Sequence, residues 1–128
     1  GMNWAYLLDE VVQKPVDRNN VAYVTHPYPQ KVDAPWEDKW ERNWGHVADH
    51  YPVVATEMGY VVKGQRGEHI PCIGDEKYGE AIINYLDKKG ISYTVWCFDP
   101  SWAPALLDDF DFNLTRQGEF FKRKLQMK

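Results

Sequence analysis

Residues 52–59, Pro-Val-Val-Ala-Thr-Glu-Met-Gly, decide how this chain folds. The stretch begins as a short apolar run, which is typical of a strand that is buried on both faces of a sheet. The run ends in the carboxylate of Glu57, and Gly59 then closes the strand. Similar runs occur at residues 21–26 (VAYVTH) and 91–98 (ISYTVWCF). The sequence therefore predicts three buried strands.

Helical patterns separate these strands. Apolar side chains recur at helical spacing over residues 37–51, 75–89 and 115–128, which predicts three helices. An amphipathic stretch at residues 3–13 and a short helical segment at residues 102–107 are also expected. Strands that alternate with helices favour parallel βαβ units, so the fold class is α/β with helices covering the sheet.

The helix predicted over residues 75–89 has the clearest ends. Asp75 is a suitable N-cap and Gly90 a suitable C-terminal stop. The Gly- and Pro-containing segment 58–74 before it is longer than most connections, which makes it a candidate functional loop. The chain shows no internal repeat and no domain boundary, so residues 1–128 are expected to form a single domain.

Composition and charge exclude several functions. Fifteen basic and nineteen acidic residues give a net charge of −4, with no basic patch for nucleic acid. No apolar run is long enough for a membrane span, and no signal-peptide pattern opens the chain. His46 and His50 have a spacing that can bind zinc, but no third ligand is evident, so neither a metal nor a cofactor is predicted. Cys72 and Cys97 show no metal-binding spacing.

Polar and aromatic side chains follow each predicted strand: His26 and Tyr28, then Glu57, then Trp96 and Asp99. In parallel α/β folds, the loops after the carboxyl ends of the strands build the binding site. We therefore expect these side chains to meet at one edge of the sheet. Aromatic residues make up 15% of the chain, which indicates either a core built from large rings or a surface of flat rings for a ligand, and the second interpretation requires several rings at the same edge.

Three of these stretches together resemble a known enzyme family. Residues 24–29 (VTHPYP), 52–59 and 92–96 (SYTVW) are similar, in order and spacing, to the last three strands of family 5 glycoside hydrolases of the cellulase type. The likeness runs from about Trp4 to Phe121. It implies that the chain is the C-terminal portion of a glycoside hydrolase, a partial (β/α)8 TIM barrel with about three parallel strands.

The resemblance also implies roles for single residues. Glu57 matches the catalytic nucleophile, and His26 and Tyr28 match the pair that orders the nucleophile and the neighbouring sugar. Trp96 matches the aromatic floor of the subsite where cleavage occurs. The implied reaction is retaining hydrolysis of O-glycosidic bonds in a β-linked polysaccharide, with a β-linked glucan as the expected partner. A retaining glycosidase needs an ionised carboxylate to attack the anomeric carbon.

Each of these residues also has an ordinary structural interpretation. Glutamate is usually a solvated loop residue, a histidine can be merely hydrogen-bonded, and Trp96 can belong to the core. Asp99 and Trp102 are the less specific candidates for substrate binding. Asp99 can simply cap the segment that follows it, whereas Trp102 can extend the sugar-binding surface by one subsite.

The sequence departs from the family in one respect. The general acid/base of the family is a Glu in an Asn-Glu pair, and no such dipeptide occurs here. A complete barrel takes ~250 residues, so we expect the acid/base half to be missing and the isolated chain to be inactive. The chain would then form a homo-oligomer or join a complementary half-barrel. The alternative is a non-catalytic sugar-binding or remnant half-barrel that self-associates. Members of the family are usually secreted.

Overall fold

The three predicted strands form one parallel sheet. In the computed structural model, which describes residues 2–127, the strands are β1 (Tyr23–Thr25), β2 (Val53–Ala55) and β3 (Ser92–Tyr93). They pair in sequence order, β1-β2-β3, with Val24 opposite Val54 and Ala55 opposite Tyr93. This arrangement confirms the α/β class and the order of the parallel strands, although each strand is shorter than its apolar run.

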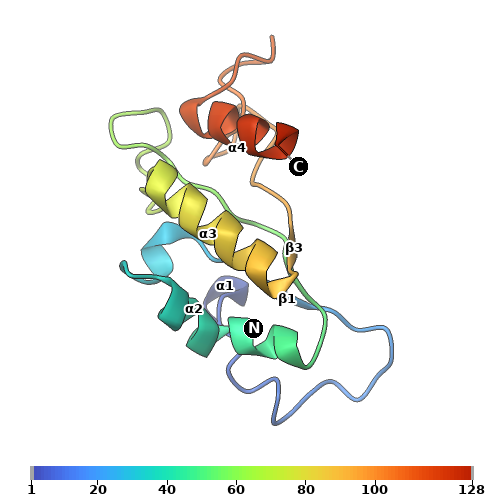
Figure 1. Cartoon of the computed structure of the whole chain (residues 1–128). Coiled ribbons are helices and arrows are strands. Elements are labelled where there is room, and N and C mark those ends of the chain that lie inside the picture. Colours follow the sequence, from blue (N-terminus) through green and yellow to red (C-terminus); the bar gives the residue numbers. More distant parts are fainter. Residues whose placement is uncertain (1, 128) are drawn as a thin grey trace.

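Helices connect and cover the strands. They are α2 (Glu37–Asn43), α3 (Glu76–Lys89) and α4 (Arg116–Gln126), with 3₁₀ turns η1 (Pro29–Lys31) and η2 (Gly45–Asp49). Helix α3 lies between α2 and α4 and packs beside β3 (Figure 1). The helix predicted over residues 37–51 is thus divided into α2 and η2, while the other two predicted helices form close to their expected limits.

The sequence signals at the ends of α3 act as predicted. The Asp75 carboxylate accepts hydrogen bonds from the backbone N–H groups of Lys77 and Tyr78, at 2.9 and 3.2 Å. Gly90 ends the helix in the left-handed conformation, with φ of 67°. Thr115 caps α4 in the same manner, since its hydroxyl accepts from the N–H of Gly118 at 3.0 Å. These caps fix where α3 and α4 begin on the sheet.

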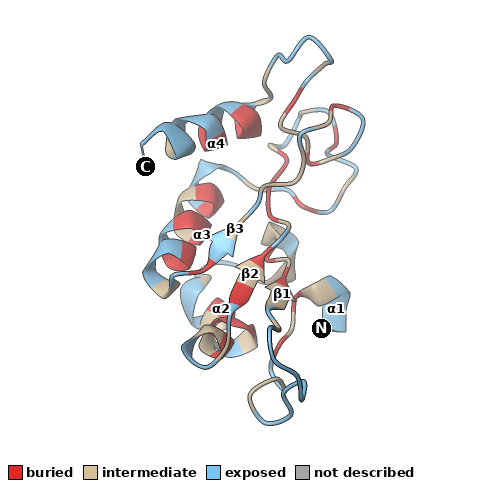
Figure 2. Cartoon of the chain, turned by 90° about the vertical axis from the view of Figure 1, so that its right-hand side faces the viewer, coloured by how far each residue is buried: buried red, intermediate tan, exposed pale blue. Residues whose placement is uncertain are grey.

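Aromatic side chains fill the core between α2 and α3. Trp40 and Trp44 are almost completely buried, and Tyr85 lies against both rings. Trp36 stacks on Trp40, with ring centroids 6.0 Å apart. Buried residues lie in β1 and β2 and along one side of α3 and α4, whereas β3 has none (Figure 2). The repeated tryptophans of the 37–51 segment are therefore a packing stripe.

The amphipathic stretch predicted at residues 3–13 is not a right-handed helix. Its first turn, α1 (Met2–Ala5), has left-handed backbone angles, and turns follow it. The buried side chains are Tyr6 and Leu8, two positions apart, whereas a helix would bury residues three or four apart. The N–H of Leu8 donates instead to the carbonyl of Asn43, at 2.8 Å. Tertiary contacts therefore override the local helical pattern.

The short helix expected over residues 102–107 is also absent. Its backbone pairs with Cys97 instead: Cys97 N–H donates to Pro104 O, and Leu106 N–H donates to Cys97 O, both at 2.9 Å. These bonds use the groups that a helix would need, and Pro104 has no N–H to contribute. The segment consequently runs back alongside the end of the third strand.

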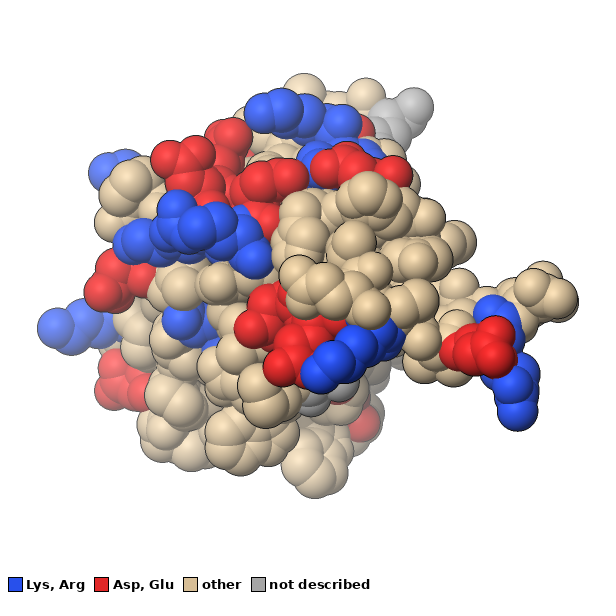
Figure 3. Space-filling view, turned by 90° about the horizontal axis from the view of Figure 1, so that it is seen from below, with Lys and Arg blue, Asp and Glu red and all other residues tan. Residues whose placement is uncertain are grey.

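Charges of both signs are interspersed on the face seen from below in Figure 3. Several of them pair across elements: Lys89 contacts Glu41 and Asp49, at 3.2 and 2.7 Å, and Lys124 contacts Glu80 at 2.6 Å. Within residues 2–127, no helix has the length and apolar character that crossing a membrane requires.

Candidate functional site

The residues that follow β1 and β2 meet at the carboxyl edge of the sheet. The parallel register places Thr25 beside Ala55, so the chain segments leaving the two strands emerge together. Tyr28 and Glu57 lie on these segments, and the Tyr28 hydroxyl donates a hydrogen bond to Glu57 Oε2 at 3.0 Å. The contact that the sequence led us to expect between these two side chains is present.

His26 flanks the same carboxylate. Its Nδ1 lies 3.6 Å from Glu57 Oε2, and its Nε2 lies 3.0 Å from the Thr56 hydroxyl. Thr94 in turn donates its hydroxyl proton to the Thr56 carbonyl at 2.5 Å. The imidazole is thus fixed on both sides, and the segment after β3 supports the residue that precedes Glu57.

The environment keeps Tyr28 protonated. Burial, followed by the negative charge of Glu57, raises the pKa of the Tyr28 phenol far above its ordinary value. A phenol with a raised pKa stays neutral through the physiological range and can only donate to a carboxylate. Tyr28 therefore presents a fixed proton to one oxygen of Glu57 and leaves the other oxygen available.

A cleft of about 730 Å³ opens in front of this pair. Its walls come from three chain segments that are distant in sequence, namely the first turn, the segment after β1 and the segment after β2. The lining residues are Asn3, Trp4, Ala5, His26, Tyr28, Gln30, Lys31, Glu57 and Pro71. Glu57 is the one carboxylate in this set of described residues.

Trp4 is the cleft residue that sequence reasoning missed. The amphipathic pattern of residues 3–13 would bury Trp4 on its apolar face, but Trp4 is 84% exposed and lines the cleft. Asn3, Trp4 and Ala5 all have left-handed backbones, with φ of 57°, 53° and 58°. Left-handed backbone costs a non-glycine residue about 1–2 kcal/mol. Helical periodicity could not indicate such a turn, and no other local signal in residues 3–13 does.

Trp96 lies next to the site through its backbone. Its N–H donates to the Met58 carbonyl at 2.9 Å, which places it beside the residue that follows Glu57. Its side chain is half-buried, lies outside the set that lines the cleft, and is followed by a cis peptide bond to Cys97.

Asp99 and Trp102 are farther along the same loop. The Asp99 carboxylate accepts from the N–H of Ser101 at 2.6 Å, which is a local turn contact. Trp102 is 66% exposed, and neither residue lines the cleft.

Gln117 joins the loops after β2 and β3. Only 2% of its surface is exposed, and its Nε2 donates to the carbonyls of Trp96 and Pro104, both at 3.2 Å. Its Oε1 accepts from the N–H of Tyr60. Gly59 makes room for this arrangement, because a Cβ there would lie 2.6 Å from Gln117 Oε1 and 3.0 Å from the Trp96 carbonyl oxygen. The glycine of the Glu-Met-Gly stretch is thus a packing requirement.

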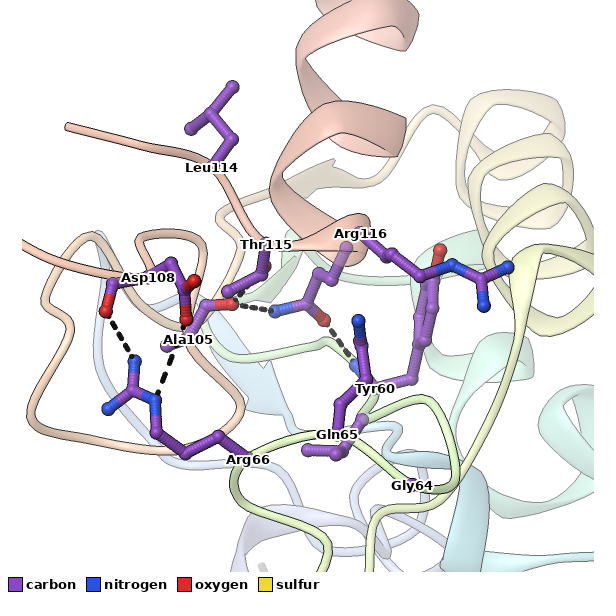
Figure 4. A pocket seen from close by; sticks show the side chains of 11 residues that line it. Tyr60, Gly64, Gln65, Arg66, Ala105, Asp108, Leu114, Thr115 and Arg116 are labelled. Atoms are coloured by element: carbon purple, nitrogen blue, oxygen red, sulfur yellow. Dashed lines mark hydrogen bonds and ion pairs between the residues drawn. The ribbon is translucent and has the colours of Figure 1, made fainter.

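A second pocket, of about 370 Å³, lies beside these loops (Figure 4). In Figure 4, Arg66 reaches from the 58–74 loop toward the loop that carries Asp108. Its guanidinium donates to the carbonyls of Leu107 and Asp108, at 3.2 and 3.1 Å, and lies 3.7 Å from the Asp108 carboxylate. Arg66 therefore holds the 58–74 loop against the loop that carries Asp108.

Metal ligands do not gather at either pocket. Across residues 2–127, no three His, Cys, Asp or Glu side chains come close enough to hold a metal ion. His46, one of the two histidines with zinc-like spacing, has its Nδ1 3.0 Å from the carbonyl of Glu41.

The chain is similar in sequence and in fold to known proteins. The family model "Cellulase (glycosyl hydrolase family 5)" matches residues 1–101. A beta-glucanase from Saccharophagus degradans, solved in complex with cellotetraose, has 44% identity and a TM-score of 0.94 over 99% of this chain. No curated protein sequence matches the chain.

Two more distant structures share the fold. An endocellulase from Pyrococcus horikoshii, in a cellotetraose complex, has 20% identity and a TM-score of 0.71 over 98% of this chain. The catalytic domain of an endoglucanase from Xanthomonas campestris pv. campestris has 22% identity and a TM-score of 0.66 over 90%. This chain spans 40% of the beta-glucanase and 37% and 36% of the other two chains.

Proposed function

The chain belongs to the cellulase family, glycosyl hydrolase family 5, and from this premise we propose that it supplies the nucleophile half of a retaining β-glucan hydrolase. Glu57 is the nucleophile in this proposal, and His26 and Tyr28 orient it. The single observation that carries the proposal is the hydrogen bond from Tyr28 to Glu57 inside an open cleft.

The contacts of Glu57 suit the chemistry of a nucleophile. In a retaining glycosidase, a carboxylate attacks the anomeric carbon and forms a covalent glycosyl-enzyme intermediate, which water then hydrolyses. The Tyr28 hydroxyl donates to Oε2 of Glu57 and so fixes that oxygen. The other oxygen is free to attack, and His26 at 3.6 Å limits the rotation of the carboxylate.

The cleft also offers an apolar surface for a sugar. The exposed ring of Trp4 lines it, and a flat ring matches the C–H face of a pyranose. The beta-glucanase that is 44% identical to this chain was solved with cellotetraose. We infer that the substrate class is a β-linked glucan oligosaccharide. We propose Trp96, Asp99 and Trp102, which follow β3 and lie outside the cleft lining, as further substrate contacts.

The general acid must come from outside the cleft residues described above. A retaining enzyme places its two carboxyl groups about 5–5.5 Å apart, and Glu57 has no second carboxylate beside it among the lining residues. We infer that the acid/base belongs to barrel strands that these 128 residues do not supply.

The second candidate function is sugar binding without catalysis. The observation that favours it is the same lone carboxylate, because a cleft with an aromatic wall and no acid can bind an oligosaccharide without cleaving it. Both functions predict binding of cellotetraose, and only the first predicts covalent chemistry at Glu57.

Covalent trapping separates the two candidates. The probe is 2,4-dinitrophenyl 2-deoxy-2-fluoro-β-cellobioside, whose leaving group needs little protonation and whose fluorine slows hydrolysis of the intermediate. The glycosyl–carboxylate bond forms as the dinitrophenolate leaves. We expect intact-mass and peptide analysis to find the fluorocellobiosyl group on Glu57. E57Q should remain unlabelled, and E68Q, in an exposed loop, should label like the parent chain. An unlabelled parent chain that still binds cellotetraose supports the second candidate.

A further inference from the structure

Lys31 lies directly over the exposed indole of Trp4. Its Nζ is 5.3 Å from the centroid of the ring, within the range of a cation–π interaction. The same ammonium donates hydrogen bonds to the carbonyl and the side-chain oxygen of Asn3, at 3.0 and 3.1 Å. One side chain therefore contacts both the ring and the backbone turn that carries it.

The turn that presents Trp4 needs such support. Three consecutive non-glycine residues are left-handed, and this conformation persists only where surrounding contacts impose it. On its C-terminal side, the carbonyl of Ala5 accepts from the N–H of His26 at 3.1 Å. On its N-terminal side, the bonds from Lys31 to Asn3 reach the turn from η1.

The position of Lys31 in the sequence links this support to Glu57. Lys31 is the last residue of η1, and Tyr28 immediately precedes that turn. The N–H of Lys31 donates to the carbonyl of Tyr28 at 3.1 Å. The segment that delivers the phenol to Glu57 therefore also delivers the ammonium to Trp4, within one cleft.

We propose that Lys31 is a positioning residue that fixes the Trp4 indole as a one-sided platform for a β-linked glucose unit. This inference rests on the proposed function. The ammonium occupies one face of the ring and anchors the turn through Asn3, so that only the opposite face is presented to a pyranose. Lys31 acts through Trp4 and is not a catalytic residue.

The test follows the Trp4 ring and sugar binding separately. The full chain is labelled with 5-fluorotryptophan, and W4F identifies the ¹⁹F resonance of Trp4. In K31M, which keeps most of the aliphatic stem and removes the ammonium, we expect this resonance to shift and broaden without any sugar. The other five tryptophan resonances should stay in place and report an intact fold. K31R should retain the parent signal, because guanidinium also binds aromatic faces.

Affinity for cellotetraose is measured by calorimetry on the same variants. We expect K31M to bind about 3- to 10-fold more weakly, with K31R close to the parent chain. K14M is the matched control, since Lys14 is exposed and pairs only with Glu10 among the described contacts. Its affinity and its ¹⁹F spectrum should both be unchanged.

Each remaining outcome decides against one of the two ideas. A Trp4 resonance that is identical in K31M and the parent chain overturns the positioning role, whatever happens to affinity. Weaker binding with an unmoved resonance means that Lys31 contacts the sugar directly. If neither the parent chain nor W4F binds cellotetraose, the proposed function fails, while the ¹⁹F comparison still reports on Lys31.

Discussion

Tyr28 and Glu57 are 29 residues apart in sequence, yet the phenol of one donates to the carboxylate of the other across 3.0 Å. The contact exists because β1 and β2 are parallel and in register, which brings their carboxyl ends to one edge. The cleft residues His26 and Trp4 assemble around this pair.

Y28F should make the chain less sensitive to alkali. The pKa of Tyr28 is raised in the folded state, mainly by burial, so the folded chain holds a proton that the unfolded chain releases above its ordinary pKa of 10.0. Stability is therefore fully present below pH 10 and falls as pH rises above it, by about 1.4 kcal/mol per pH unit for each such tyrosine. Urea unfolding between pH 9 and 11 measures the slope. In Y28F, unfolding should release one proton fewer, so the unfolding free energy should fall less steeply with pH. An equal slope would contradict the raised pKa of Tyr28.

The isolated chain should not hydrolyse unactivated β-glucan. General acid help contributes about 10²–10⁴-fold, and the cleft residues supply no second carboxylate to give it. Reducing-sugar release from barley β-glucan and from cellotetraose is the measurement, with E57Q as the control. Robust hydrolysis that E57Q abolishes would show that association of copies, or an unrecognised carboxylate, provides the acid.

G59A should destabilise the chain more than G90A. A Cβ on Gly59 would meet the Gln117 side chain and the Trp96 carbonyl, whereas a Cβ on Gly90 would have open space. Gly90 is left-handed, so its replacement costs about 1 kcal/mol from backbone conformation alone. The added clash at Gly59 should raise the loss to about 2–4 kcal/mol. Urea unfolding of both variants gives the difference, and equal losses would show that the rim loops adjust freely.

Q117L should loosen the loop that holds Trp96. The substitution leaves the carbonyl of Trp96 without its side-chain donor and the N–H of Tyr60 without its acceptor, whereas the carbonyl of Pro104 still accepts from the N–H of Cys97. Unsatisfied buried groups cost about 1–3 kcal/mol each, so a loss of about 2–4 kcal/mol in unfolding free energy is expected. Q13L, at an exposed position, is the matched control and should be neutral. Faster hydrogen exchange at the N–H groups of Tyr60 and Trp96 would locate the change, and unchanged exchange would argue against a role of Gln117 in joining the two loops.

The local pattern of the sequence was sufficient for the main elements. The apolar run before Glu57 predicted β2, and the Asp75 cap and Gly90 stop predicted α3. The motifs around His26, Tyr28 and Glu57 also pointed to the edge where their side chains meet, because in parallel strands the residues that follow each run lie at the same end. Apolar runs and helix caps depend on residues that are close together in the chain, so they can be recognised in the sequence without the tertiary structure.

Only the tertiary structure determined the first turn and the loop after β3. Residues 3–13 have a helical pattern, but Tyr6 and Leu8 are buried against the core, and Lys31 holds Asn3 in a left-handed turn that exposes Trp4. Residues 102–107 pair with Cys97 instead of with themselves. In both segments a backbone group bonds to a partner outside the segment, Leu8 to Asn43 and Leu106 to Cys97, and a short segment gains too little from its own helical bonds to resist such contacts. The Trp4 wall of the cleft is therefore a product of the assembled fold. The sequence alone determined the parallel strands and the position of Glu57 at the end of the second one.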